Sequence, residues 1–289
     1  MGVQLLTRRQ FTKASLAGLT GAALCGGSLP AVRSAHAAGT AWAESDGGDV
    51  RLIADAPQAD GTIRAALDIR LKPGWKTYWR DPGASGIPPS LSIDGSVNIA
   101  SAKLQFPAPL VVRDAQSVWA GYKEPVRFPL TLTQDNPADA SVLSAKVFLG
   151  ICERVCIPFQ ASFTLPIPQS ADPRNADQIA DAFKTLPGQP AADFRILQAE
   201  RSRSADRVVE VVVELPEFRP AGVEPHVFLA CTDCPISFEP GRLLGMDGRL
   251  ARFAVSPAYA PKEANLSGSQ VVVVATLGQR SIETMIEIG

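Results

Sequence analysis

A two-residue alternation of apolar and polar side chains is the feature that most constrains this fold. Between residues 62 and 71, apolar residues such as Leu67 alternate with mostly polar ones such as Asp68. Such alternation is typical of a strand with one face in a core and the other face toward solvent. Because no helix of normal length fits between this run and the similar runs around it, the pattern predicts an antiparallel β-sandwich. The similar short apolar runs, separated by turns rich in Gly, Pro and Asp, lie at 50–54, 102–106, 126–133, 142–151 and 158–166.

After Pro166 the periodicity changes to that of a helix. Ile179 and Phe183 have helical spacing, and Asp172 before Pro173 is a typical helix cap, so we expect a short helix and linker over 169–192. Further strand patterns then predict a second, smaller β-sandwich over 193–289, following the first over 45–168. These later strands are expected at 194–200, 207–215, 226–230, 250–255, 270–277 and 281–288, with turns at 247–248 and 277–280.

The first 37 residues have the organisation of an export signal. Arg8 and Arg9 precede a mild run of Ala, Gly and Leu, and the sequence Ala-His-Ala at 35–37 offers a small-residue cleavage site. This pattern predicts a bacterial twin-arginine signal peptide over 1–37 and a periplasmic mature protein, with a Sec signal or a membrane anchor as the alternative. The run is shorter and richer in glycine than a membrane span, and no later stretch approaches one, so we expect the chain not to span a membrane.

Composition excludes several classes of function. The chain has 28 Lys and Arg against 29 Asp and Glu, so its formal net charge of −1 gives no basic excess for binding nucleic acid. With only two histidines, His36 and His226, a His-rich metal site or a triad with an imidazole base is disfavoured. We therefore expect no cofactor and no resident metal, and cysteine is the reactive residue type that remains.

The cysteines fall into two close pairs. Cys25 lies in the expected signal, which leaves Cys152 with Cys156 and Cys231 with Cys234. In the oxidising periplasm, an even number of cysteines in tight pairs indicates thiol–disulfide chemistry.

The first pair lies between two strand-like runs. If these runs form a hairpin, its three-residue connection places Cys152 opposite Cys156 with Cα atoms about 4.5–5.5 Å apart, close enough for a disulfide. Closing so small a ring stabilises the fold only modestly, which favours a reversible redox centre over a static bond, although the static bond remains an alternative. Between the cysteines, Arg154 would favour a thiolate and Glu153 would oppose it, or both charges are simply solvated at the hairpin tip.

Four separated motifs in the first sandwich resemble a known family. They are Lys-Pro-Gly-Trp-Lys-Thr-Tyr-Trp-Arg at 72–80, Gly-Ile-Pro-Pro at 86–89, Gly-Tyr-Lys at 121–123 and Cys-x3-Cys-x-Pro at 152–158. In this order they resemble the periplasmic N-terminal domain of the DsbD-type thiol:disulfide interchange proteins. The resemblance is closest to the branch found in suppressor-of-copper-sensitivity membrane reductases, and residues 190–289 weakly resemble the second β-sandwich that often follows in that branch.

This resemblance implies two immunoglobulin-like sandwiches and a thiol:disulfide oxidoreductase of the protein-disulfide reductase type. Cys152 and Cys156 match the family's redox pair, which takes electrons from a membrane-embedded thiol reductase, here on a separate chain. The electrons pass to periplasmic thioredoxin-like or disulfide isomerase proteins, and the resemblance also implies links to cytochrome c biogenesis and copper tolerance. Trp119 matches the aromatic residue of the cap loop that covers the cysteines, and Tyr122 is expected to help it.

The chain departs from better-known family members at two points. Their cysteines are separated by five residues and these by three. The acids that precede their cap aromatic are replaced here by Ser117 and Val118. Carboxylate assistance to proton transfer is therefore in doubt.

The second pair, Cys231 and Cys234, is a Cys-x-x-Cys sequence that follows an apolar strand at 227–230. A thioredoxin-like domain is disfavoured, because Pro240 prevents the helix that such a motif would open. Three interpretations stay open for this pair: an auxiliary redox pair, a structural disulfide or half of a metal site. For the whole protein, the alternatives are a zinc or copper module that uses all four cysteines, and a structural adaptor with two static disulfides.

Overall fold

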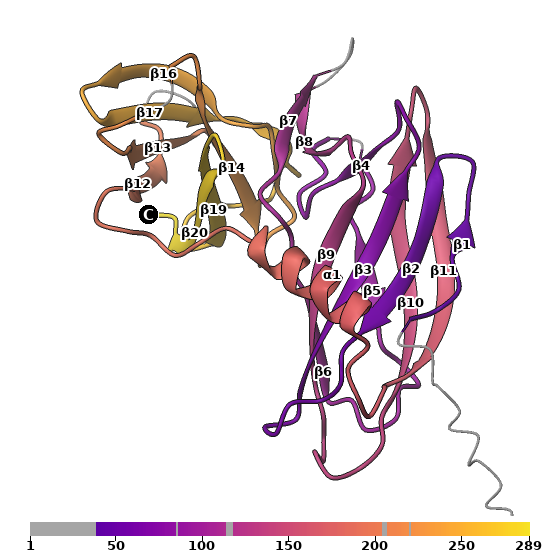
Figure 1. The fold of residues 1–289 in the computed structure, drawn as a ribbon. Helices are drawn as coiled ribbons and strands as arrows, with labels where there is room; N and C mark the ends of the chain where they lie inside the picture. Colours follow the sequence, from indigo (N-terminus) through magenta and orange to yellow (C-terminus); the bar gives the residue numbers. More distant parts are fainter. Residues whose placement is uncertain (1–38, 85, 114–117, 204–206, 220) are drawn as a thin grey trace, which may run out of the picture. The chain divides into compact units, whose positions relative to one another are not determined.

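The computed structural model describes residues 39–84, 86–113, 118–203, 207–219 and 221–289 (Figure 1). The expected signal peptide at 1–37 lies outside these residues. The described chain is almost entirely antiparallel β-structure with one helix, α1, which confirms the all-β class. None of its helices has the length and apolar character needed to cross a membrane.

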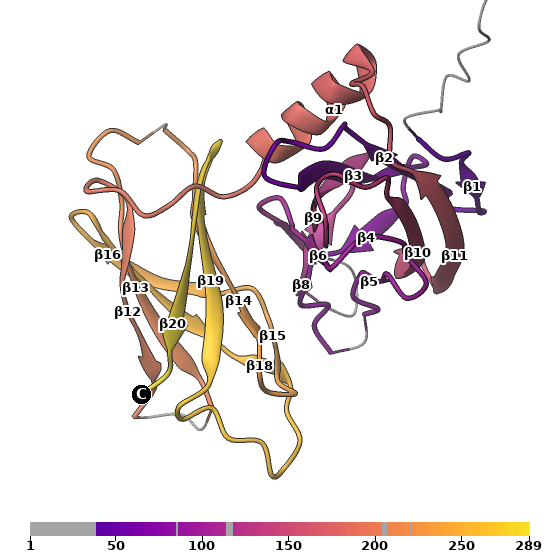
Figure 2. The ribbon, with the colours of Figure 1, turned by 90° about the horizontal axis from the view of Figure 1, so that it is seen from below.

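The first sandwich consists of two antiparallel sheets (Figure 2). Its first sheet has the order β1 (Ala43–Glu44), β2 (Gly48–Ala54), β3 (Thr62–Leu71), β9 (Val126–Thr133) and β6 (Ser101–Leu104). Its second sheet has the order β11 (Cys156–Pro166), β10 (Val142–Cys152), β4 (Lys76–Tyr78), β8 (Val118–Tyr122) and β7 (Leu110–Arg113), and β5 (Ser90–Ser92) also pairs with β10.

One face of β3 lies in the apolar core, as the alternation predicts, but much of the other face is covered rather than open to solvent. Ile63, Leu67 and Ile69 are fully buried in the core between the two sheets. On the opposite face, Asp68 is also buried, because the guanidinium groups of Arg51 and Arg127 lie 3.0 and 3.1 Å from its carboxylate. The strand thus turns one face to an apolar core and the other to a covered layer.

The helix α1 (Pro173–Lys184) covers part of that outer face (Figure 1). Asp172 caps it as expected, since its side chain accepts a hydrogen bond of 2.9 Å from the backbone N–H of Arg174. Ile179 and Ala182 are buried against Ile53 and Ala66 of the sheet. The helix ends at Lys184, and the backbone N–H of Thr185 bonds back to the last turn.

The second β-unit follows the linker and has a core of its own. A four-stranded sheet has the order β12 (Arg195–Arg201), β13 (Val209–Glu214), β17 (Leu250–Val255) and β16 (Arg242–Asp247). A three-stranded sheet has the order β14 (Pro225–Cys231), β19 (Gln270–Leu277) and β20 (Arg280–Glu287), and β15 (Ser237–Phe238) pairs with β18 (Pro257–Tyr259). The described residues between 39 and 289 belong to one compact unit, so the domain limits 45–168 and 193–289 stay a prediction.

Candidate redox site

The first cysteine pair closes the end of a long hairpin. Strands β10 and β11 pair along their whole length, and the last pair in register is Cys152 opposite Cys156. The two residues form a disulfide, with Cα atoms 4.1 Å apart, slightly closer than the hairpin geometry predicts. The three-residue connection at 153–155 forms the tip, so the bond lies where these two strands end.

The two sulfur-bearing residues differ in exposure. Cys152 is only 2% exposed, whereas Cys156 is half-buried. Glu153 and Arg154 are exposed at the tip, as expected for solvated charges, and Val155 is 74% exposed. A thiol that approaches from solvent therefore reaches Cys156 more easily than Cys152.

Two aromatic side chains, Tyr78 and Trp119, share an apolar cluster with the disulfide. The hydroxyl of Tyr78 lies 2.9 Å from Sγ of Cys156 and 3.4 Å from Sγ of Cys152. Because a disulfide sulfur carries no proton, the hydroxyl is the donor. The ring of Trp119 packs on that of Tyr78 at 4.5 Å between centroids, and the ammonium of Lys76 lies 5.3 Å from the Trp119 ring. Trp119 is 4% exposed and belongs to one apolar cluster with both cysteines, the position that a cover requires.

Short strands hold these rings in place. β4 pairs with β10 on one side, where Lys76 lies opposite Cys152, and with β8 on the other, where Tyr78 lies opposite Gly121. Glycine is needed at two points, because a Cβ atom at Gly121 would collide with the Trp119 ring and one at Gly150 would lie 3.1 Å from the Tyr78 ring. The strand pairing thus places Tyr78 and Trp119 on the face of the sheet that carries the sulfurs.

Tyr122 lies elsewhere. Its ring packs against Phe128 in the main core, 5.2 Å between centroids, and its hydroxyl donates a 2.8 Å hydrogen bond to the carbonyl of Pro107. Residues three apart in a strand face opposite sides of the sheet, so Tyr122 and Trp119 do not share a face. The expected help from Tyr122 is therefore replaced by Tyr78. Tyr78 lies in the first of the four motifs, but its position in that motif does not indicate a contact with the cysteines.

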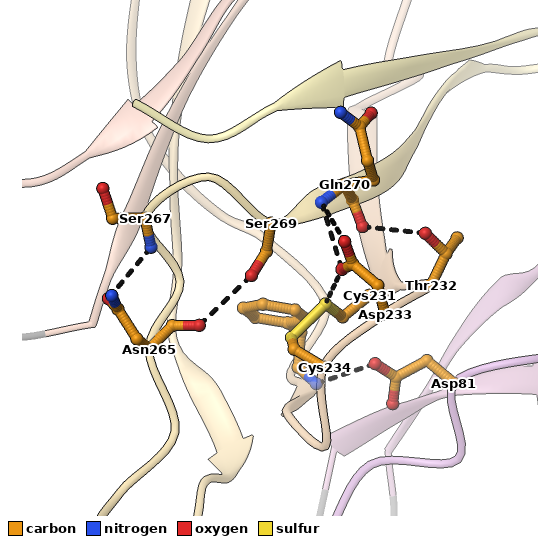
Figure 3. The surroundings of a disulfide bond; sticks show 10 residues. Asp81, Cys231, Thr232, Asp233, Cys234, Asn265, Ser267, Ser269 and Gln270 are labelled. Carbon is orange, nitrogen blue, oxygen red and sulfur yellow. Dashed lines mark hydrogen bonds between the residues drawn. A yellow bond between two sulfur atoms is a disulfide. The ribbon is translucent and has the colours of Figure 1, made fainter.

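The second cysteine pair also forms a disulfide (Figure 3). Cys231 is the last residue of β14, Cys234 follows in a turn, and the Cα atoms are 5.6 Å apart. Strand β15 follows the turn, so no helix begins at this motif, as Pro240 predicts. Both cysteines are half-buried, and Oδ1 of Asp233 lies 3.4 Å from Sγ of Cys231.

The four cysteines do not form one ligand set in the described residues. Cys231, Asp233 and Cys234 are the group whose potential ligand atoms lie within 4.8 Å of one another, and neither Cys152 nor Cys156 is a member. A thiolate metal site also requires reduced sulfurs, whereas both pairs are disulfides in this structure. A zinc or copper site made of four cysteines is therefore not supported by the geometry.

Asp81 connects the neighbourhoods of the two disulfides. It follows Tyr78 by three residues, and its buried carboxylate accepts hydrogen bonds of 2.9 Å from the backbone N–H groups of Gly83 and Phe238. Phe238 follows Cys234 by four residues, and Figure 3 shows Asp81 beside this segment. Burial raises the pKa of Asp81 to about 6.

Comparison with known proteins bears on the first sandwich and on the fold. Residues 49–168 match the family model described as the N-terminal part of the thiol:disulfide interchange protein DsbD. Comparison with curated protein sequences found no match. Among solved structures, the N-terminal periplasmic domain of ScsB from Proteus mirabilis shares the fold, with a TM-score of 0.70 and 22% identity. That alignment covers 87% of this chain and 98% of the ScsB domain. Residues 49–168 are therefore a DsbD-type N-terminal domain, and residues 169–289 extend it with the helix and the second β-unit.

Proposed function

We propose that this protein is a periplasmic thiol–disulfide relay whose redox centre is the Cys152–Cys156 pair. One observation supports this most strongly: the disulfide lies at a hairpin end with the Tyr78 hydroxyl 2.9 Å from Sγ of Cys156 and Trp119 packed in the same cluster. A hydroxyl at this distance stabilises a thiolate on Cys156 by a charge-assisted hydrogen bond. A bulky ring over the sulfurs restricts which thiols reach them.

The difference in exposure supports a division of roles between the two sulfurs. A thiolate of the electron donor attacks Sγ of Cys156, a mixed disulfide forms and Cys152 leaves as a thiolate, which takes up a proton. The second thiol of the donor then loses its proton and attacks the donor sulfur that is bonded to Cys156. This attack releases Cys156 as a thiolate. Two electrons have then passed to the pair, and the donor is oxidised to a disulfide. The same steps in reverse reduce a target protein.

The expected partners follow from this cycle. The donor is a membrane-embedded thiol reductase on a separate chain, and the acceptors are periplasmic thioredoxin-like or disulfide isomerase proteins. Val155 and Ile157, 74% and 37% exposed on either side of Cys156, offer apolar contact at the point of attack. Roles in cytochrome c biogenesis or copper tolerance stay predictions.

Trapping of mixed disulfides tests the assignment. A Cys152→Ser variant, incubated with a thioredoxin-fold protein in its disulfide form, should accumulate a covalent complex through Cys156. The Cys156→Ser variant should accumulate far less, because Cys152 is buried. Equal trapping by both variants would contradict the assigned roles, and trapping by neither would contradict the relay.

Export is proposed on the sequence pattern at 1–37. Replacing Arg8 and Arg9 together by lysine should leave unprocessed precursor in the cytoplasm, as measured by cell fractionation. Continued export of this variant in cells that lack the twin-arginine translocase would show that another pathway is used.

A further inference from the structure

The Cys231–Cys234 disulfide has an accessible position that the proposed relay does not use. Both cysteines are half-buried rather than enclosed. A ring closed by two cysteines three residues apart removes little conformational entropy from the unfolded chain. This bond therefore adds less stability than one that connects distant segments, and its sulfurs are within reach of another thiol.

Hydrogen bonds hold the same turn without help from the disulfide. The backbone N–H of Thr232 donates to the carbonyl of Gln270 at 3.0 Å, and the Thr232 hydroxyl donates to the same carbonyl at 3.1 Å. The backbone N–H of Gln270 lies 3.1 and 3.2 Å from the two carboxylate oxygens of Asp233 (Figure 3). The pairing of β14 with β19 as far as Cys231 holds the segment before the turn. The hydrogen bond from the backbone N–H of Phe238 to the Asp81 carboxylate holds the segment after it. Opening the disulfide thus leaves its two sulfurs close together, ready to close again.

The carboxylate of Asp233 makes the two sulfurs chemically different. Its Oδ1 atom lies 3.4 Å from Sγ of Cys231. When the pair is reduced, the Cys231 thiol has this carboxylate as an acceptor for its proton. A negative charge also disfavours a second negative charge beside it, so the thiolate forms preferentially on Cys234.

We propose that Cys231 and Cys234 form a second redox-active centre, in which Cys234 attacks and Cys231 resolves. The Cys234 thiolate attacks a substrate disulfide, and one substrate sulfur leaves as a thiolate. Cys231 then loses its proton to solvent and attacks Sγ of Cys234. The second substrate sulfur leaves as a thiolate, and the Cys231–Cys234 disulfide re-forms. Two electrons pass to the substrate, whose thiolates take up protons, and a dithiol protein restores the pair. This inference does not rest on the function proposed for Cys152 and Cys156.

The test uses the mature protein with Cys152→Ser and Cys156→Ser, so that the second pair is the only source of thiols and the result is independent of the relay. The folded protein is equilibrated with mixtures of reduced and oxidised glutathione, alkylated and analysed by mass. A mixture of dithiol and disulfide forms across these buffers is the expected result. A pair that stays fully oxidised in the folded protein, even with excess dithiothreitol, would overturn the proposal.

Single substitutions in the same background test the division of roles. With oxidised glutathione, the Cys231→Ser variant should form a mixed disulfide through Cys234 at least tenfold faster near neutral pH than the Cys234→Ser variant does through Cys231. Asp233→Asn should raise the rate at Cys231 and shift its pH profile to lower pH, while a merely structural role would leave that profile unchanged. Equal rates at the two cysteines, or a tightly bound metal found by elemental analysis of the reduced protein, would contradict the assignment.

Discussion

The two disulfides of this chain lie in different surroundings. Cys152–Cys156 lies in one apolar cluster with Tyr78 and Trp119, and Cys152 is almost completely buried. Cys231–Cys234 is half-buried at the end of β14, and its nearest carboxylate is that of Asp233. We therefore expect access to the first pair to be limited by the neighbouring aromatic rings, and the reactivity of the second pair to depend on the charge of Asp233.

Ring size alone does not distinguish the two disulfides. Both bonds close small loops, and both therefore stabilise the fold only modestly. Their surroundings differ, because a hydroxyl donor next to a sulfur favours a thiolate and a carboxylate next to a sulfur disfavours it. We therefore expect the first pair to react selectively with protein partners and the second to react with small thiols as well.

Asp81, which contacts both neighbourhoods, gives the largest expected effect. Its folded-state pKa of about 6 lies above the value of 3.8 expected in the unfolded chain, so the native state binds this proton more tightly. The resulting stabilisation is fully present below pH 3.8 and is lost as the pH rises through 6. Between pH 4 and pH 7, the unfolding free energy of an Asp81→Asn variant should therefore rise relative to that of the native protein by on the order of 3 kcal/mol.

Urea unfolding of the two proteins across this pH range measures the difference. Because only the change with pH matters, a constant offset from the lost carboxylate hydrogen bond does not affect the outcome. A difference that stays constant from pH 4 to pH 7 would show that Asp81 has no raised pKa.

Removal of each disulfide should cost nearly the same stability. The loops closed by Cys152–Cys156 and Cys231–Cys234 are of similar size, so each pair of Ser substitutions should lower the unfolding free energy by about 2 kcal/mol. Urea unfolding under non-reducing conditions measures both. If a variant fails to fold, its disulfide is required for folding, and that cysteine pair is then structural rather than redox-active.

Trp119→Ala should remove the difference in access between the two pairs. Without the indole ring, dithiothreitol should reduce Cys152–Cys156 at least tenfold faster, while its rate at Cys231–Cys234 stays as it was. Tyr122→Phe is the matched control, because it removes an aromatic hydroxyl from the same strand but on the core side. An unchanged rate in the Trp119 variant would mean that the ring does not cover the sulfurs.

Tyr78→Phe should have the smallest effect, because it removes a single hydrogen bond to sulfur. The reduced form loses a donor to the Cys156 thiolate, so the equilibrium with glutathione should move toward the disulfide by about fivefold, equivalent to about 1 kcal/mol. Alkylation and mass analysis at equilibrium measure the shift. If the equilibrium moves toward the dithiol instead, the hydroxyl stabilises the disulfide form.

The sequence predicts the strands whose pattern is local. The expected ranges 126–133, 250–255 and 270–277 coincide with β9, β17 and β19, and the helix starts at Pro173 behind its Asp172 cap. These elements bury one face or a continuous run, so their periodicity identifies them. The hairpin that brings Cys152 opposite Cys156 was predictable for the same reason.

The strands that position the site have no such pattern. β4 has three residues, and it forms because β10, more than 70 residues later in the chain, pairs with it. β8 is buried on both faces, so its residues do not alternate in polarity. The contact of Tyr78 with the sulfurs depends on these non-local pairings, and residue spacing alone does not reveal it.

A redox titration of the mature protein tests the central claim most directly. The protein is equilibrated with dithiol and disulfide buffers of defined potential, alkylated, and its Cys152 and Cys156 peptides are quantified by mass. We predict that this pair interconverts reversibly between dithiol and disulfide above about −300 mV, within reach of periplasmic partners. A Cys152–Cys156 bond that remains fully oxidised well below about −300 mV would behave as a structural disulfide and would contradict the relay.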